Sequence, residues 1–284
     1  QLGKLRIGPK IHISDSLTFE AEIDIKEDTV GPKKYFFKLK ELPLNGVATL
    51  GKQDRFFYLK RFTERYPLIS TAFTRDEEVG LQYHFGVSAL YAVLSISQGL
   101  ELDLKEPGKD ASYKLLHDDE KKDRFNGIKE FAIGIGSRLE FAEHRLLDVM
   151  AWAMSNSMTD SGTSSDVSVL QSNLPSYIST SNTQWRLGLN LETQWDRASL
   201  SAQGIYAKDG ALGRSGWFIQ PAYLLGLNTE GESFKDLRLV VRYGQLKVDT
   251  TKSVNLPASW DRTELTLGTI THLISDLFLK VEYT

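Results

Sequence analysis

Residues 54–76, DRFFYLKRFTERYPLISTAFTRD, combine several cations with aromatic and apolar side chains that water would not favour. The cations of this stretch are Arg55, Lys60, Arg61, Arg65 and Arg75. A segment of this composition, folded into the interior of a barrel, would bury Phe56, Phe57 and Phe62 against the wall. Its cations would then face the narrowest water, where a low dielectric focuses their field on passing anions. The alternative is an external loop that makes surface or subunit contacts.

More charged side chains recur at alternate positions of extended segments along the chain. The cations are Arg6, Lys10, Lys38, Lys40, Lys52, Arg138, Arg186, Arg238 and Arg242. The acids are Glu20, Glu22, Asp24, Glu130 and Glu192. In a shared lumen the cations would form a ring that attracts anions. The alternative is that they pair with acids on neighbouring strands and stiffen the wall. Together they support the prediction of a charged pore, but they do not by themselves predict a phosphate site.

Covalent and metal chemistry find no support in the sequence. The chain has no cysteine, which excludes thiolate chemistry, disulfides and cysteine-ligated metals. Its five histidines show no metal-ligand spacing. The stretch GIGSR at 134–138 lies inside an alternating segment and lacks the later Gly-Lys of a phosphate-binding loop. We therefore expect neither an enzyme nor a cofactor or metal site. The formal net charge of -3 gives no reason to expect nucleic acid as a partner.

The elements that must position these charges are extended strands with two different faces. In QWRLGLNLETQW, residues 184–195, leucines and tryptophans share one parity and polar residues the other. A period of two is typical of a strand that separates two media. We expect the leucines to face lipid and Arg186 and Glu192 to face water. The aromatic residues Trp185, Trp195, Tyr83 and Tyr283 are expected at the membrane interface.

The same alternation recurs in about fourteen segments of roughly 8–12 residues, near the length of a tilted membrane strand. Short and long connections alternate between them, with one of moderate length expected at 209–216, as in an up-and-down barrel. The polar face is too charged to pack inside a soluble sandwich. The sequence therefore predicts an all-β fold, a transmembrane antiparallel β-barrel. Segments 88–97, 145–155 and 217–227 carry apolar residues on both parities, which predicts a folded loop covering them from inside.

We expect a single barrel domain over residues 1–284, with the inward-folded loop at 54–76. The predicted external loops are 98–126, 156–183 and 246–261. The start QLGKLRIG has neither the basic beginning nor the apolar core expected of a signal peptide, and the mature form of a secreted protein would look the same. Both visible ends are expected at the outer rim, which suggests one further strand beyond each end and about sixteen in the complete protein. A complete fourteen-stranded barrel is the alternative.

Three stretches resemble the phosphate-selective porin O/P family of Gram-negative outer membranes. They are residues 46–73, 191–210 and 267–284, the second with Ser201 to Tyr206 in place of the family's SAQGEY and Ile205 at its Glu position. The resemblance implies a sixteen-stranded homotrimer with a loop in the lumen and selectivity for anions. Arg6, Lys52, Arg55, Arg65 and Arg242 fall where such basic residues are plausible, whereas the lumenal acids depart from the pattern.

We therefore expect a passive channel in the bacterial outer membrane for small hydrophilic solutes or ions, with a lumen narrowed by residues 54–76. Its expected partners are membrane lipid, lipopolysaccharide, further copies of itself, and small solutes or anions. The first alternative is a structural barrel that holds a protein partner in the outer membrane. An outer-membrane enzyme would need a catalytic set at one rim, and a soluble β-rich binding protein would need no detergent.

Overall fold

A computed structural model describes residues 5–25, 30–59, 61–63, 65–74, 77–105, 115–120, 130–158, 166–173, 181–226, 236–249, 261–274 and 277–284. The first strands are β1 (Leu5–Ile7), β2 (Lys10–His12), β3 (Leu17–Ile25), β4 (Val30–Leu42), β5 (Gly46–Gln53), β6 (Glu78–Val87) and β7 (Leu90–Ser97). They are followed by β8 (Leu100–Lys105), β9 (Leu115–Glu120), β10 (Glu130–Ala142), β11 (Arg145–Ser157), β12 (Thr183–Trp195) and β13 (Ala198–Asp209). The last strands are β14 (Leu212–Gly226), β15 (Asp236–Val248), β16 (Arg262–Ile274) and β17 (Leu277–Tyr283). The helical elements are η1 (Pro43–Asn45), η2 (Ser70–Thr74) and α1 (Asp166–Asn173).

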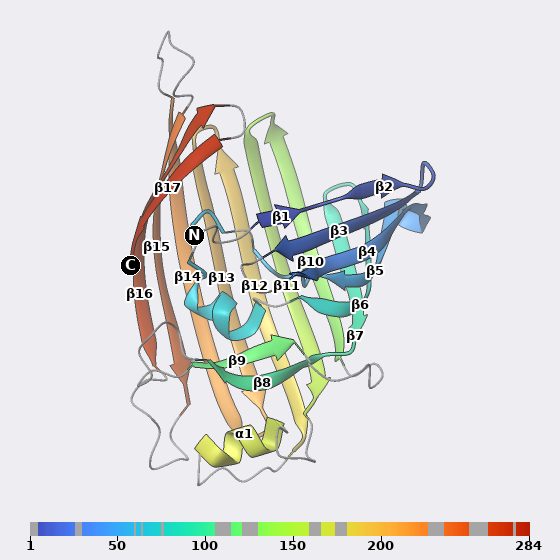
Figure 1. Ribbon diagram of the computed structural model, residues 1–284, viewed down its shortest axis with the longest axis vertical. Coiled ribbons are helices and arrows are strands. Elements are labelled where there is room, and N and C mark those ends of the chain that lie inside the picture. Colours follow the sequence, from blue (N-terminus) through green and yellow to red (C-terminus); the bar gives the residue numbers. More distant parts are fainter. Residues whose placement is uncertain are drawn as a thin grey trace.

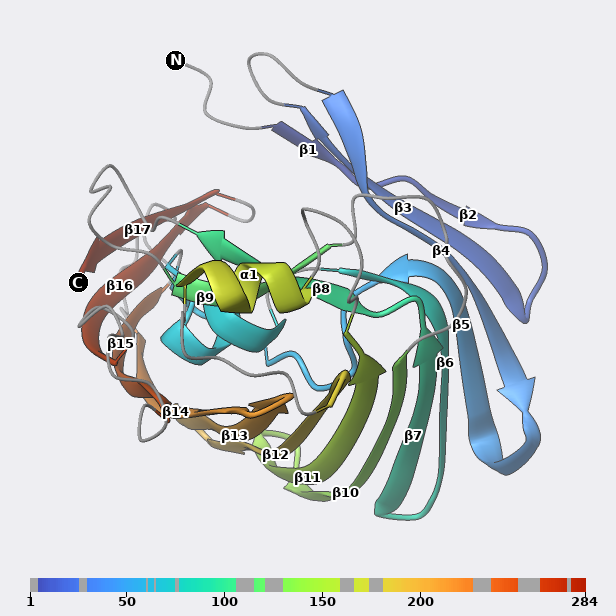
Figure 2. The same cartoon turned by 90° about the horizontal axis from the view of Figure 1, so that it is seen from below.

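Fifteen of these strands form one antiparallel sheet in the order β1-β3-β4-β5-β6-β7-β10-β11-β12-β13-β14-β15-β16-β17, with β2 paired to β3 beside this path. The sheet curves into a wall (Figures 1 and 2), and β1 and β17 are its two ends among the described residues. None of the helices in the described part of the chain has the length and apolarity that crossing a bilayer requires. The predicted all-β antiparallel barrel class is confirmed.

The two faces of the wall are inverted relative to a soluble protein. On β12, Leu187 and Leu189 are 50% and 55% exposed, whereas the alternating Arg186 and Asn190 are only 1% and 4% exposed. The same parity continues along β10, where Phe131, Ile133 and Ile135 are all exposed. Because a strand turns successive side chains to opposite faces, the apolar residues form the outer surface and the polar ones the inner surface.

The space inside the curved sheet holds folded segments of the same chain. The inward segment (the described residues 54–59, 61–63 and 65–74), which includes η2, packs with Phe57, Ile69 and Phe73 against the inner face. The separate hairpin β8–β9 and helix α1 lie within the same curve, towards the bottom of Figure 1. Apolar residues of β7, β11 and β14 meet the inward segment at Tyr91, Trp152 and Phe218. This packing explains why those three strands carry apolar residues on both parities.

The structure differs from the sequence-based expectations in two places. The sequence favours a loop over residues 209–216, but β14 already begins at Leu212 after a tight turn. The sequence also predicts that the loops at 98–126 and 156–183 are external and solvated. In their described parts, Leu102, Leu116 and Leu170 are buried together in one apolar cluster. The physical reason is that hairpin β8–β9 and α1 supply each other with an apolar surface. Residues 250–260 of the third predicted loop lie outside the described residues.

Candidate functional site in the lumen

The inward segment is fixed to the wall by its backbone and by an aromatic stack. The carbonyl oxygen of Phe57 accepts hydrogen bonds from Asn190 Nδ2 at 2.9 Å and from Gln203 Nε2 at 2.7 Å. The Phe57 ring stacks on Trp152 of β11, with 3.9 Å between the ring centroids. Trp152 in turn donates its indole N–H to Asn190 Oδ1. Buried backbone groups need such partners, so strands β11 to β13 specify where the segment lies.

Glycines on the inner face make room for this segment. A Cβ at Gly134 would come within 2.6 Å of the Phe56 ring. A Cβ at Gly216 of β14 would collide with the side chain of Ile69. These positions therefore accept the inward segment only because they carry no side chain. Gly204 of β13 has no such role, since a Cβ added there would meet nothing within 4 Å.

Arg55 lies at the centre of the first charged group, the Arg55 cluster (Arg55, Glu78, Glu130). Its Nη2 donates to Glu130 Oε2 at 2.8 Å, and its Nε lies 3.4 Å from Glu78 Oε2. All three side chains are buried, and Ser97 Oγ donates to Glu78 Oε2 at 3.0 Å. Burial lowers the pKa of Arg55, but Glu130 and Glu78 together raise its pKa above the ordinary value, so the guanidinium remains charged.

The second group, the Asp118 cluster (Asp118, Arg186, Asp209, Arg214), joins hairpin β8–β9 to the wall. Asp118 Oδ1 accepts from Arg186 Nη2 at 2.6 Å and from Arg214 Nη2 at 3.2 Å. Asp209 accepts from the same two arginines at 3.3 Å and 2.5 Å. The ring of Phe73, in the inward segment, faces both guanidinium groups. Its centroid lies 5.7 Å from Cζ of Arg186 and 4.6 Å from Cζ of Arg214. The positive charges are thus balanced by acids within contact distance.

The third group, the Arg242 cluster (Arg242, Glu264, Arg65, Thr63), joins the middle of the inward segment to β15 and β16. Arg242 Nη2 donates to Glu264 Oε1 at 3.2 Å, and Arg242 Nη1 donates to Thr63 Oγ1. Arg65 Nε donates to the other oxygen of Glu264 at 2.7 Å. Two cations therefore share one carboxylate.

The other predicted pore-lining residues have the following positions. Lys52 is buried, Lys38 is half-buried and Lys40 is exposed, while Arg61 lies 3.8 Å from the Tyr66 ring. Glu20 pairs with Lys10 at 2.9 Å, and Glu22 lies 3.6 Å from Lys33. Arg6 pairs in register with Asp24, and Lys60 and Arg75 lie outside the described residues.

The predicted interface aromatics lie in the strands as expected, but their side chains differ in exposure. Trp195 is 55% exposed, beside Phe141 and the Arg145 guanidinium. Tyr283 is exposed, and Trp185 and Tyr83 are half-buried. Tyr83 donates its hydroxyl to the carbonyl of Pro43 at 2.7 Å. Their role at a membrane interface stays a prediction.

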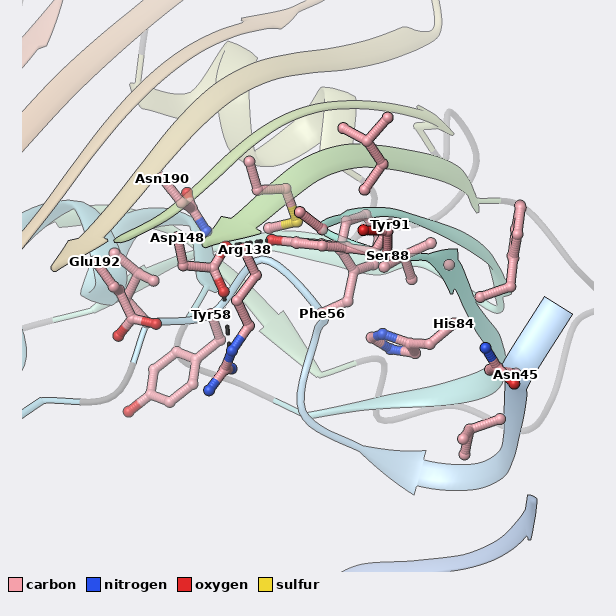
Figure 3. A pocket seen from close by; sticks show the side chains of 18 residues that line it. Asn45, Phe56, Tyr58, His84, Ser88, Tyr91, Arg138, Asp148, Asn190 and Glu192 are labelled. Atoms are coloured by element: carbon pink, nitrogen blue, oxygen red, sulfur yellow. Dashed lines mark hydrogen bonds and ion pairs between the residues drawn. The ribbon is translucent and has the colours of Figure 1, made fainter. Parts of the chain in front are cut away.

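A cavity of ≈ 530 Å³ opens between the inward segment and the short turns of the wall (Figure 3). Phe56, Tyr58 and Leu59 of the inward segment line it, together with Asn45 and Ser88 near the turns. Its polar wall carries Tyr91, Arg138, Asp148, Asn190 and Glu192, which come from β7, β10, β11 and β12. This part of the lumen differs from the three ion-paired clusters because its charged groups reach open space.

Sequence reasoning missed Arg214 and the acids Glu78, Asp118, Asp209 and Glu264. Arg214 falls in the stretch that the sequence favours as a loop, although Arg214, Gly216, Phe218 and Gln220 follow one parity through residues 212–220. Extending the alternation backwards from Phe218 would have placed Arg214 on the inner wall. Asp118 had no comparable signal, because its partners come from strands β12 and β14, far away in the sequence.

No protein-family model and no curated protein sequence matches the chain. Among solved structures, OmpF of Salmonella typhi, in complex with daunomycin, is similar with a TM-score of 0.57 and 11% identity, over 99% of this chain and 81% of that chain. In-vitro folded OmpT, an outer membrane protein of Vibrio cholerae, gives 0.52 and 10% identity, over 98% and 77% of the two chains. The trimer form of that OmpT gives 0.50 and 11% identity, over 99% and 79%. At such low identity these likenesses show the fold, which is that of outer-membrane β-barrels and agrees with the predicted location. The resemblance to the phosphate-selective family stays a prediction.

Proposed function

We propose that this protein is an outer-membrane porin through which small hydrophilic solutes or ions diffuse passively. The observation that carries the proposal is the inverted wall, with exposed leucines outside and charged side chains inside. In this proposal the inward segment narrows the lumen, and its cations Arg55, Arg61 and Arg65 contribute to the lining charge. Diameter and lining charge then select solutes without covalent chemistry, so the proposal includes no enzymatic step.

The charge preference of the proposed pore depends on how far its cations are neutralised. Arg55, Arg186 and Arg242 all lie against carboxylates, which supports a structural role for these residues over a free anion-attracting ring. Lys40 is exposed and supports a remaining attraction for anions such as phosphate. We therefore propose a mixed-charge pore with weak anion preference.

Single-channel recording in planar bilayers tests the proposal. Purified protein is expected to give discrete conducting steps. In a salt gradient, the reversal potential is expected to be small, with the sign that indicates a higher permeability for anions than for cations. The absence of conducting steps from correctly folded protein would refute the transport function. A strong cation preference would refute the anion part alone.

The apolar outer face also supports assembly as a homotrimer in contact with lipid and lipopolysaccharide, since one solved neighbour is described as a trimer form. Light scattering of the detergent-solubilised protein gives its mass. A monomer under conditions that keep related trimers intact would contradict this assembly.

A structural barrel with a filled lumen is the second candidate. It is favoured by the dense packing of hairpin β8–β9 and α1, where Leu102 N–H donates to Asp166 Oδ1 at 2.6 Å and Leu116 and Leu170 are buried. A protein partner that co-purifies in fixed ratio, together with no conductance, would favour this candidate over the porin.

A further inference from the structure

The cavity of ≈ 530 Å³ differs in construction from the rest of the lumen (Figure 3). Phe56 and Tyr58 of the inward segment line it on one side, and His84 and Asn45 lie on the side opposite Arg138. Arg138 has 54% of its side chain exposed, whereas the side chains of Arg55, Arg186 and Arg214 are at most 1% exposed. A solute that enters the cavity therefore meets polar groups that the arginine clusters do not offer.

The polar groups of the cavity are already arranged as donors and acceptors. Tyr91 donates its hydroxyl to Asp148 Oδ1 at 2.6 Å. Arg138 Nη1 lies 3.9 Å from Asp148 Oδ2, and Arg138 Nε donates to Glu140 Oε1 at 3.0 Å. These contacts hold the side chains in place before any solute arrives, and Arg138 offsets one of the neighbouring carboxylate charges. Preorganisation of this kind lowers the entropy cost of binding.

The chemistry of this wall suits hydroxyl groups better than anions. A hydroxyl both donates and accepts, so it can bond to a carboxylate and a guanidinium in the same site. An anion would be repelled, because the carboxylates of Asp148, Glu192 and Glu140 outnumber the single guanidinium of Arg138. The aromatic side chains of Phe56 and Tyr58 supply apolar surface for the C–H groups of a ring-shaped solute.

We propose that this cavity binds a neutral polyhydroxylated solute of monosaccharide to disaccharide size. The volume lies in the range of small-molecule sites, about 300–1,000 Å³. Arg138, Asp148 and Glu192 bind the hydroxyl groups, and Phe56 and Tyr58 contact the ring. The inference rests on the proposed porin function only for the route by which the solute arrives.

Isothermal titration calorimetry on the full chain in detergent micelles tests the proposal without requiring conductance. D-glucose and maltose are expected to bind, and inorganic phosphate is expected to give no saturable heat. Asp148→Asn and Glu192→Gln are each expected to weaken sugar binding about tenfold, because each removes a charged hydrogen-bond acceptor. Glu143→Gln, which changes an exposed residue of a turn at the same rim, is the matched control and is expected to bind as the parent does.

The outcomes separate this inference from the proposed function. Sugar binding without conducting steps would support the site and refute the pore. Conducting steps without saturable sugar binding would overturn the site and leave the pore. Phosphate binding that Asp148→Asn strengthens would also overturn it, because the cavity would then be an anion site. Circular dichroism and heat-modifiable gel migration identify any variant that fails to fold. Tyr58→Ala is an independent variant from the inward segment and is expected to weaken sugar binding, because it removes a contact with the ring.

Discussion

Arg55 shows how a buried cation can hold a loop to a membrane barrel. The guanidinium bridges the inward segment to Glu130 on β10 and lies near Glu78 on β6. Taking these charges out of water has a large cost, which the short contacts and the additional Ser97 hydrogen bond offset. Once formed, such a group is sensitive to the loss of any member.

Arg55→Leu is expected to destabilise the folded protein by about 3–5 kcal/mol, because it leaves Glu78 and Glu130 buried without their cation. Urea unfolding followed by tryptophan fluorescence measures the change. Arg145→Leu is the control, since Arg145 forms its ion pair with Asp196 in the exposed turn, and no comparable loss is expected there. Equal unfolding midpoints for the two variants would contradict a structural role of the Arg55 cluster.

At the scale of single residues, the sequence predicted which face of the wall a side chain takes better than it predicted the residues that the side chain contacts. The parity of Arg186 and Arg242 on their strands indicated the inner face correctly. Their acids were not predictable, because Asp118 comes from a hairpin inside the barrel and Glu264 also binds Arg65 from the inward segment. Alternation reports which face a side chain takes, and it carries no information on contacts between distant segments.

At the scale of elements, glycines in the wall strands leave the space into which side chains of the inward segment pack. Gly216 leaves space for Ile69, and Gly134 leaves space for Phe56. Cores are packed closely, so a side chain added at such a position must displace the segment or strain it.

Gly216→Val is expected to destabilise the packing of the inward segment by about 1–3 kcal/mol through overpacking. Limited proteolysis of the protein in liposomes should then cut residues 54–74 faster. Gly204→Val on the neighbouring strand β13 is the matched control, because nothing lies within 4 Å of the position its Cβ would take. Similar cutting rates in both variants would show that the inward segment does not depend on this contact.

Hairpin β8–β9 is a second inward element, anchored by one carboxylate between two arginines. Asp118→Asn is expected to release the hairpin from Arg186 and Arg214, because an amide replaces the charge that faces them. If the hairpin obstructs the pore, single-channel conductance should rise in this variant. Asp196→Asn in the exposed turn is the control. An unchanged conductance together with unchanged protease resistance would show that Asp118 is not the anchor.

The strands of the wall were predictable, but the elements inside it were not. The wall strands follow period two over many residues, and segments 88–97, 145–155 and 217–227 even indicated the covering from inside. LELDLK at 100–105 also alternates, yet it is short and lies in a charged stretch. Helix α1 carries few apolar residues, and its burial depends on β8 and on the ends of neighbouring strands. Tertiary contacts decide such short elements.

The whole molecule is defined by which medium each face of the wall meets. Leu187, Leu189 and Ile135 are 50%, 55% and 62% exposed, whereas the inner face gathers charged and amide side chains. Contiguous apolar surface of this extent requires a membrane or a partner. This property was fully predictable because it depends on sequence parity alone, and the solved outer-membrane neighbours share the fold.

Site-directed labelling tests the inverted wall most directly. Because the sequence has no cysteine, a thiol reagent reacts only with the cysteine that is introduced. His84 on β6 lines the cavity, while Leu94 on the paired strand β7 is 45% exposed on the outer face. In liposomes, His84→Cys is expected to react with a water-soluble thiol reagent. A fluorophore attached at Leu94→Cys is expected to be quenched by nitroxide-labelled lipid. Quenching by lipid at position 84, with reaction in water at position 94, would contradict the inverted wall and the porin function with it.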